Sequence, residues 1–128
     1  ASPKEYMPDE NYLLRGKELS KLECTKFTIT HSPSEAIKNA DVVITDVWAS
    51  MGHETEAKNR IKAFKDYQVN SELMDLAKPN AIVLHCLPAH REEEITEEVL
   101  EAHASEIFDE SENRMHAQKA VLVKLMKN

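Results

Sequence analysis

The sequence predicts an α/β fold in which a mainly parallel sheet carries helices on both faces. Residues 41–47 (DVVITDV) and 81–87 (AIVLHCL) are almost continuously apolar, which is typical of strands buried on both faces. Segments with the periodicity of amphipathic helices separate the predicted strands. Strands that alternate with helices form βαβ units, so neighbouring strands should run parallel.

The N-terminal third should contain a helix, a strand and a second helix. In residues 9–22 the apolar side chains return at helical spacing, which predicts a helix. Residues 25–31 alternate between apolar and polar side chains, which predicts a short strand. Ser32, Pro33 and Glu35 then form a capping box with proline at the first helical position, so a short helix should begin there.

Helices should follow each of the two apolar strands. Residues 54–65 place apolar side chains on one stripe, with acids early and bases late, which suits the helix dipole. A shorter helix over residues 71–77 should end before Pro79. The expected elements after the second strand are a helix at residues 96–103, a short strand at residues 106–109 and a last helix over residues 111–125.

Composition narrows the class of protein. The chain has 128 residues and a net charge of −7, which fits one domain (1–128) and argues against nucleic acid or an anionic membrane as a partner. No apolar run approaches a membrane span, and no signal peptide is visible. Cys24 and Cys86 form no disulfide framework, so we expect free thiols and a cytoplasmic protein. The opening Ala1 suggests that the chain begins inside a longer one.

The predicted sheet locates a candidate ligand site. Ligands of such sheets bind beyond the carboxyl ends of the strands, where residues 46–52 (DVWASMG) and 85–91 (HCLPAHR) lie. If the strands are neighbours, the two loops should converge. Asp46 could bind an ammonium group and Ser50 offers a hydroxyl group. The alternative is an ordinary polar loop in which Asp46 caps the local backbone.

The second loop contains a thiol beside a histidine. Cys86 next to His85 could be ionised and contact a substrate amine, or it could simply be a small buried hydrophobic residue. Pro88 ends the strand and is a candidate for a cis bond that would expose the Leu87 carbonyl. A zinc site built from His85, Cys86 and His90 lacks a second ligand pair at suitable spacing, so we expect no metal.

A third polar segment lies near the C-terminus, at residues 110–120 (ESENRMHAQKA). Arg114 should sit in the first turn of the last helix, where free backbone N–H groups favour anions. A positive charge there interacts unfavourably with the helix dipole, which indicates that Arg114 has a role other than stabilising the helix. The alternative is a solvated arginine paired with Glu110 or Glu112. The acidic run at residues 92–94 is expected to form a solvated face.

Taken together, DVWASMG, HCLPAHR and ENRMHAQKA closely resemble the second domain of ornithine carbamoyltransferases, and the resemblance extends to ASPKEYMPD and FKDYQVN. It implies a Rossmann-like domain that lacks its opening βα unit. It also implies a homotrimeric enzyme of arginine metabolism that needs no cofactor. That enzyme transfers the carbamoyl group of carbamoyl phosphate to the δ-amine of L-ornithine, giving citrulline and phosphate. The family's Ser-x-Arg-Thr and His-Pro-x-Gln segments do not occur here, so the chain alone should be inactive.

The resemblance also assigns roles to residues. Asp46 would bind the α-amino group of ornithine, and Ser50 and Met51 would close over its amino-acid end. Cys86 would lie beside the side chain of ornithine, and the Leu87 carbonyl would position the reacting amines. The residues expected to contact carbamoyl phosphate are Cys86, Leu87 and Arg114.

Two other functions are compatible with the same residues. A noncatalytic module that binds an amino acid would explain the missing phosphate loop. A thiol-dependent enzyme using Cys86 and His85 would form a covalent adduct, which carbamoyl transfer does not need.

Overall fold

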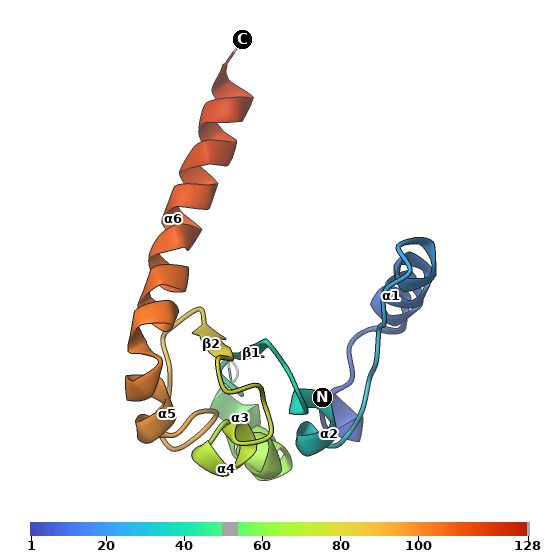
Figure 1. Ribbon diagram of the computed structural model, residues 1–128, viewed down its shortest axis with the longest axis vertical. Coiled ribbons are helices and arrows are strands. Elements are labelled where there is room, and N and C mark those ends of the chain that lie inside the picture. The colour runs from blue at the N-terminus through green and yellow to red at the C-terminus, as the bar shows by residue number, and fades with distance from the viewer. Residues whose placement is uncertain (50–53, 128) are drawn as a thin grey trace.

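The computed structural model describes residues 1–49 and 54–127 and has the predicted α/β fold with a parallel sheet (Figure 1). Ser50, Met51 and Gly52 lie outside the described residues. The elements in chain order are η1 (Lys4–Tyr6), α1 (Glu10–Leu22), α2 (Pro33–Ile37), β1 (Val42–Thr45), α3 (Glu54–Phe64), η2 (Lys65–Tyr67), α4 (Ser71–Met74), β2 (Ile82–His85), α5 (Glu97–Ala102) and α6 (Ala104–Met126).

The two strands are parallel neighbours, in the register Val42 beside Ile82 through Thr45 beside His85. Complete burial of the strands was nevertheless a wrong prediction. Ile44 in β1 is 70% exposed, and in β2 only alternate residues are buried. The physical reason is that β1 pairs only with β2 among the described residues, so one edge and part of one face of β1 meet no other element.

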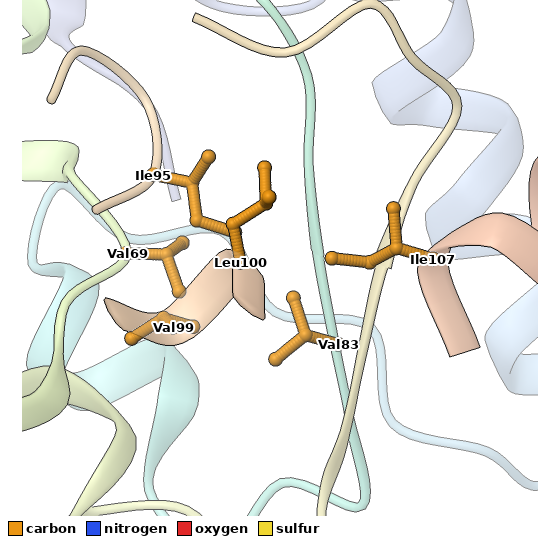
Figure 2. Close-up of a cluster of buried hydrophobic side chains, with 6 residues drawn as sticks. All are labelled: Val69, Val83, Ile95, Val99, Leu100 and Ile107. Atoms are coloured by element: carbon orange, nitrogen blue, oxygen red, sulfur yellow. The ribbon is translucent and has the colours of Figure 1, made fainter. Parts of the chain in front are cut away.

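A compact hydrophobic core holds β2 in place. Its side chains come from β2, α5, α6 and the two segments that meet at the Val69–Ile95 bridge, as Figure 2 shows. The members are Val69, Val83, Ile95, Val99, Leu100 and Ile107. Removing such side chains from water contributes roughly 1.5–3 kcal/mol each. The loop that follows β2 therefore starts from a well-packed strand.

The last helix is longer than the sequence predicted. α6 runs unbroken from Ala104 to Met126, so the predicted strand at residues 106–109 is wrong. Its residues have no strand to pair with in the described structure, and helical spacing lets Ile107 reach the core while Phe108 stays exposed. Arg114 consequently lies in the middle of α6 and not in its first turn. Figure 1 shows α6 projecting away from the sheet.

Both N-terminal helices have side-chain caps, and the cap at Ser32 was predicted. Asp9 accepts a hydrogen bond from the backbone N–H of Asn11 at 2.9 Å, and Ser32 Oγ accepts one from the N–H of Glu35 at 3.3 Å. The capping box at α2 is indirect, because the Glu35 carboxylate accepts a hydrogen bond from Thr30 Oγ1, which in turn accepts one from the Ser32 N–H. These contacts fix the start of both helices.

The predicted strand at residues 25–31 is wrong, because the segment is extended but pairs with no described strand. It lies close to α1 at Gly16. A Cβ atom on Gly16 would stand 2.8 Å from the ring of Phe27, so glycine permits this close approach. That packing need explains a glycine within a helix, where it otherwise costs about 1 kcal/mol.

Large apolar side chains remain exposed on α6, among them Met115, Leu122 and Leu125. Leu125 is 75% exposed. Surfaces of this kind mark sites of association with other polypeptide segments. None of the described helices is both long and apolar enough to cross a membrane.

Candidate functional site

The register of the sheet brings the two predicted loops together. Because Thr45 lies beside His85, the residues that follow them, Asp46 and Cys86, also become neighbours. The Cys86 thiol donates a hydrogen bond to Asp46 Oδ1 at a distance of 3.5 Å. Asp46 remains exposed and also accepts a bond from its neighbour's backbone, Val47 N–H, at 2.8 Å. A small ligand could therefore touch a carboxylate and a thiol at once.

The environment keeps the Cys86 thiol protonated. Burial raises its pKa, and the charge of Asp46 together with their hydrogen bond raises it further, while Arg114 offsets part of the effect. Thiol nucleophiles in enzymes normally have the opposite shift, because the thiolate is the reactive form. The geometry thus favours a neutral hydrogen-bonding thiol and argues against the thiol-dependent enzyme.

Arg114 reaches the same place from α6. Its Nη1 donates a hydrogen bond to the backbone carbonyl of Cys86 at 2.6 Å. Arg114 reaches this place because α6 packs on β2. The prediction that it lies at an anion site in the first turn of a helix is wrong, because α6 begins at Ala104. The exposed guanidinium has five N–H donors, and one bond to a carbonyl leaves others for an anion. In the described structure Arg114 pairs with neither Glu110 nor Glu112.

The backbone after β2 has an unusual path. The peptide bond between Leu87 and Pro88 is cis, as expected, and Leu87 has a φ of 52°. Its N–H donates a hydrogen bond to His85 Nδ1 at 2.9 Å. His85 is fully buried, and its other ring nitrogen, Nε2, lies 3.2 Å from Glu94 Oε1.

Glu94 is a residue whose importance sequence reasoning missed. Within the acidic run assigned to a solvated face, Glu94 alone is fully buried. Besides His85, it accepts a hydrogen bond from the backbone N–H of His90 at 2.6 Å. Burial raises the pKa of Glu94, but the bonds from His85 and His90 outweigh burial and leave the pKa below its usual value. No pattern in a single acidic run distinguishes this one buried member.

Two groups of side chains in the described structure are close enough to share a metal ion. One joins Asp46, His85 and Cys86, and the other joins His90 to Glu93 and Glu94. The zinc set considered from the sequence is therefore divided between two places. In the first group both ring nitrogens of His85 already make hydrogen bonds, so a metal would have to break one of them. We assign no metal to either group.

A large hollow in the described structure lies away from the contact between Asp46 and Cys86. It has a volume of about 460 Å³ and lies against β1 and α3. Asp46 and Arg60 line it, but its walls are mainly apolar and do not include Cys86. Its lining suits the packing of apolar side chains better than the binding of a charged substrate.

The fold and the site together define an α/β domain whose ligand groups gather at the carboxyl ends of two parallel strands. The family described as "Aspartate/ornithine carbamoyltransferase, Asp/Orn binding domain" matches residues 1–125. Because this match covers nearly the whole chain, the chain belongs to the aspartate/ornithine carbamoyltransferase family.

Known relatives agree with this membership. The chain is 53% identical over 123 residues to an ornithine carbamoyltransferase of Nitratiruptor sp., covering 96% of this chain and 40% of that protein. It is 52% identical over 126 residues to one from Carboxydothermus hydrogenoformans, covering 98% of this chain and 40% of that protein. The chain therefore spans about 40% of the length of these relatives.

Solved structures show the same fold. The anabolic ornithine carbamoyltransferase of Campylobacter jejuni superposes with a TM-score of 0.92 at 39% identity, covering 98% of this chain and 41% of that one. The enzyme from Pyrococcus furiosus gives a TM-score of 0.86 at 48% identity, covering 95% and 39%. A more distant N-acetyl-L-ornithine transcarbamylase gives 0.79 at 28%, covering 96% and 38%.

Proposed function

We propose that residues 1–128 form the ornithine-binding part of an ornithine carbamoyltransferase, which becomes active with the polypeptide that supplies the carbamoyl phosphate site. The observation that carries this proposal is the hydrogen bond between Cys86 and Asp46, which joins a neutral thiol to a carboxylate beyond the carboxyl ends of two neighbouring strands. Relatives that are 52–53% identical to this chain are named ornithine carbamoyltransferases, which also supports the proposal.

One end of the substrate would be bound by charge. Asp46 would accept hydrogen bonds from the α-ammonium group of ornithine, and Ser50 and Met51 would close over the amino-acid end. Cys86 would lie beside the aliphatic side chain with its thiol protonated, so that it adds no negative charge near the reacting amine. The Leu87 carbonyl would accept a hydrogen bond from that amine.

The second substrate would lie against α6. Arg114 and the backbone of Cys86 and Leu87 would contact carbamoyl phosphate. The neutral δ-amine attacks the carbonyl carbon and gives a tetrahedral intermediate. Its collapse breaks the bond between that carbon and the phosphate oxygen, and the nitrogen loses its extra proton. Alignment of the two substrates and stabilisation of the developing oxyanion would supply most of the acceleration. The reaction needs no metal or cofactor.

Charge also separates ornithine from related substrates. N-acetylated ornithine has no α-ammonium group, so it would leave the Asp46 carboxylate without a cation. By resemblance, an enzyme for aspartate would have proline where Cys86 stands. Both residues therefore favour free ornithine within a family whose name also covers aspartate.

The experiment uses the full-length polypeptide that contains this chain and measures citrulline formation. Asp46→Asn should lower kcat/KM for ornithine roughly 10- to 100-fold, the worth of a hydrogen bond to a charged group. Asp41→Asn is the matched control, because Asp41 precedes the same strand and pairs with Lys78 at 2.7 Å. Equal effects of both substitutions would contradict the proposal. Ornithine binding without any citrulline would instead support a noncatalytic amino-acid-binding module.

The cellular setting is part of the same proposal. Both cysteines are free thiols, which fits the reducing cytoplasm, and cell fractionation would test this location. We also propose that the full-length enzyme is a homotrimer, on the strength of its resemblance to the family. Sedimentation of the full-length protein as a monomer would contradict the trimer.

A further inference from the structure

Buried side chains join the two ends of the segment from residue 85 to residue 94. His85 at the end of β2 and Glu94 are both fully buried, which is unusual for ionisable groups. They contact each other at 3.2 Å beneath the loop that carries Cys86. Because neither is exposed, neither can touch a substrate at the surface of the sheet.

The hydrogen bonds settle which His85 nitrogen carries the proton. Nδ1 accepts a hydrogen bond from the Leu87 N–H, so Nδ1 has no proton of its own. The proton is therefore on Nε2, which donates to Glu94 Oε1. The same oxygen accepts the His90 N–H at 2.6 Å. The series of hydrogen bonds ends at a backbone amide, which cannot give up its proton, so it is no proton path to the Cys86 thiol.

One peptide unit is held at both of its polar ends. The peptide between Cys86 and Leu87 donates its N–H to His85, and its carbonyl oxygen accepts from Arg114 at 2.6 Å. Leu87 has a φ of 52°, a left-handed conformation that costs a non-glycine residue about 1 kcal/mol or more. The two hydrogen bonds keep this unfavourable conformation in place.

A purely stabilising role accounts poorly for this pair. Burying an ionised group costs free energy, and well-packed apolar residues often give equal or greater stability in its place. What apolar residues cannot supply is an acceptor aimed at the Leu87 N–H. The proposed reaction depends on the geometry of this peptide, because the backbone of Cys86 and Leu87 would contact carbamoyl phosphate. The peptide also orients the Leu87 carbonyl, which follows it in the chain and would accept a hydrogen bond from the amine of ornithine.

We propose that His85 is a positioning residue for carbamoyl transfer, held in place by Glu94, and that it acts by fixing the Cys86–Leu87 peptide. This inference rests on the proposed function and extends it to two buried residues. Glu94 orients the ring, His85 fixes the peptide N–H, and Arg114 fixes the carbonyl on the other side.

The test compares two substitutions of His85 in the full-length protein. His85→Asn places an amide oxygen near the position of Nδ1 and can still accept from Leu87, but it does not reach Glu94. His85→Gln can still donate to Glu94 but leaves the Leu87 N–H unpaired. We expect His85→Gln to lower kcat roughly 10- to 100-fold, as small misplacements do, with KM for carbamoyl phosphate changed less than about threefold. The kcat of His85→Asn should stay much closer to that of the unsubstituted protein.

A second measurement separates this inference from the proposed function. Hydrogen exchange at the Leu87 amide should be at least about tenfold faster in His85→Gln than in the unsubstituted protein, because that amide loses its partner. Unchanged exchange, or unchanged kcat, in His85→Gln would overturn the inference even if His85→Asn failed to fold. If the unsubstituted protein formed no citrulline, the proposed function would fail while exchange still tested the positioning of the peptide.

Glu94→Gln distinguishes positioning from proton transfer. The amide oxygen of glutamine can still accept from His85 and His90, so the pH profile of kcat should keep its shape. A shift of the profile in Glu94→Gln would show that Glu94 takes part in proton transfer and would overturn the positioning role.

Discussion

At the scale of single residues, the site depends on what surrounds each group more than on which groups are present. Cys86 is a neutral donor because burial raises the pKa of its thiol and the Asp46 carboxylate, 3.5 Å away, raises it further. Glu94 is ionised because two N–H groups donate to one of its oxygens and lower its pKa. The same thiol beside a cation, or the same carboxylate without donors, would have the opposite protonation preference.

The protonated state of Cys86 predicts a modest role for its sulfur. Cys86→Ser keeps a small donor, so we expect kcat to fall by no more than about 100-fold, with no covalent intermediate in either protein. Rapid quenching of the reaction followed by mass spectrometry of the intact enzyme checks this. A carbamoylated or otherwise modified Cys86 would refute the neutral-thiol reading.

The lowered pKa of Glu94 predicts a dependence of stability on pH. The ionised carboxylate stabilises the fold above the ordinary glutamate pKa of about 4.3, and this contribution is lost as pH falls through the lower folded-state value. At pH 7, Glu94→Gln should cost roughly 1–3 kcal/mol of stability. Thermal unfolding of both proteins between pH 7 and pH 3 should show the difference narrowing below pH 4. A difference independent of pH would mean that Glu94 is not ionised in the folded protein.

At the scale of elements, sequence patterns predicted most helices and both paired strands. The caps at Asp9 and Ser32 and the apolar runs are local signals, and local signals were enough for these elements. The two wrong strands, at residues 25–31 and 106–109, fail for a non-local reason, since a strand needs a partner that its own sequence does not specify. Convergence of Asp46 and Cys86 followed from sheet topology, whereas burial of Glu94 depends on packing that no local pattern reveals.

The length of α6 is open to a direct test. If the helix began at Ser111, as the sequence suggested, proline there would be tolerated. Because Ser111 lies inside α6, Ser111→Pro should cost about 3 kcal/mol or more, while Ser111→Ala should be nearly neutral. Chemical denaturation of the two variants measures this. Similar stability of the two variants would mean that the helix begins near Ser111 and not at Ala104.

At the scale of the whole molecule, the exposed apolar surfaces and the partial site both fit the fact that the chain spans only part of the length of its relatives. β1 keeps an unpaired edge in the described structure, and α6 exposes apolar side chains along its distal half. Both features fit a chain that spans about 40% of the length of its relatives. In the proposed function the site is similarly partial, since Asp46, Cys86 and Arg114 would supply groups for only one side of the two substrates.

These surfaces predict self-association of the isolated chain. Replacing Leu122 and Leu125 by glutamate should shift the 128-residue chain toward monomer, because both side chains are largely exposed on α6. Glu112→Gln is a control that changes charge on the same helix without removing apolar surface. Sedimentation velocity measures the distribution of species. A monomeric unsubstituted chain with a cooperative melt at high temperature would contradict the prediction.

The unbroken α6 also has a mechanical consequence. Its 23 residues form a rod about 34 Å long. Arg114 near the midpoint is tied to the Cys86 carbonyl, while the core side chain Ile107 anchors one end. A force on the C-terminal end of α6 would therefore tilt the helix about Ile107. A polypeptide segment bound at that end would move Arg114 relative to the loop at residues 85–91.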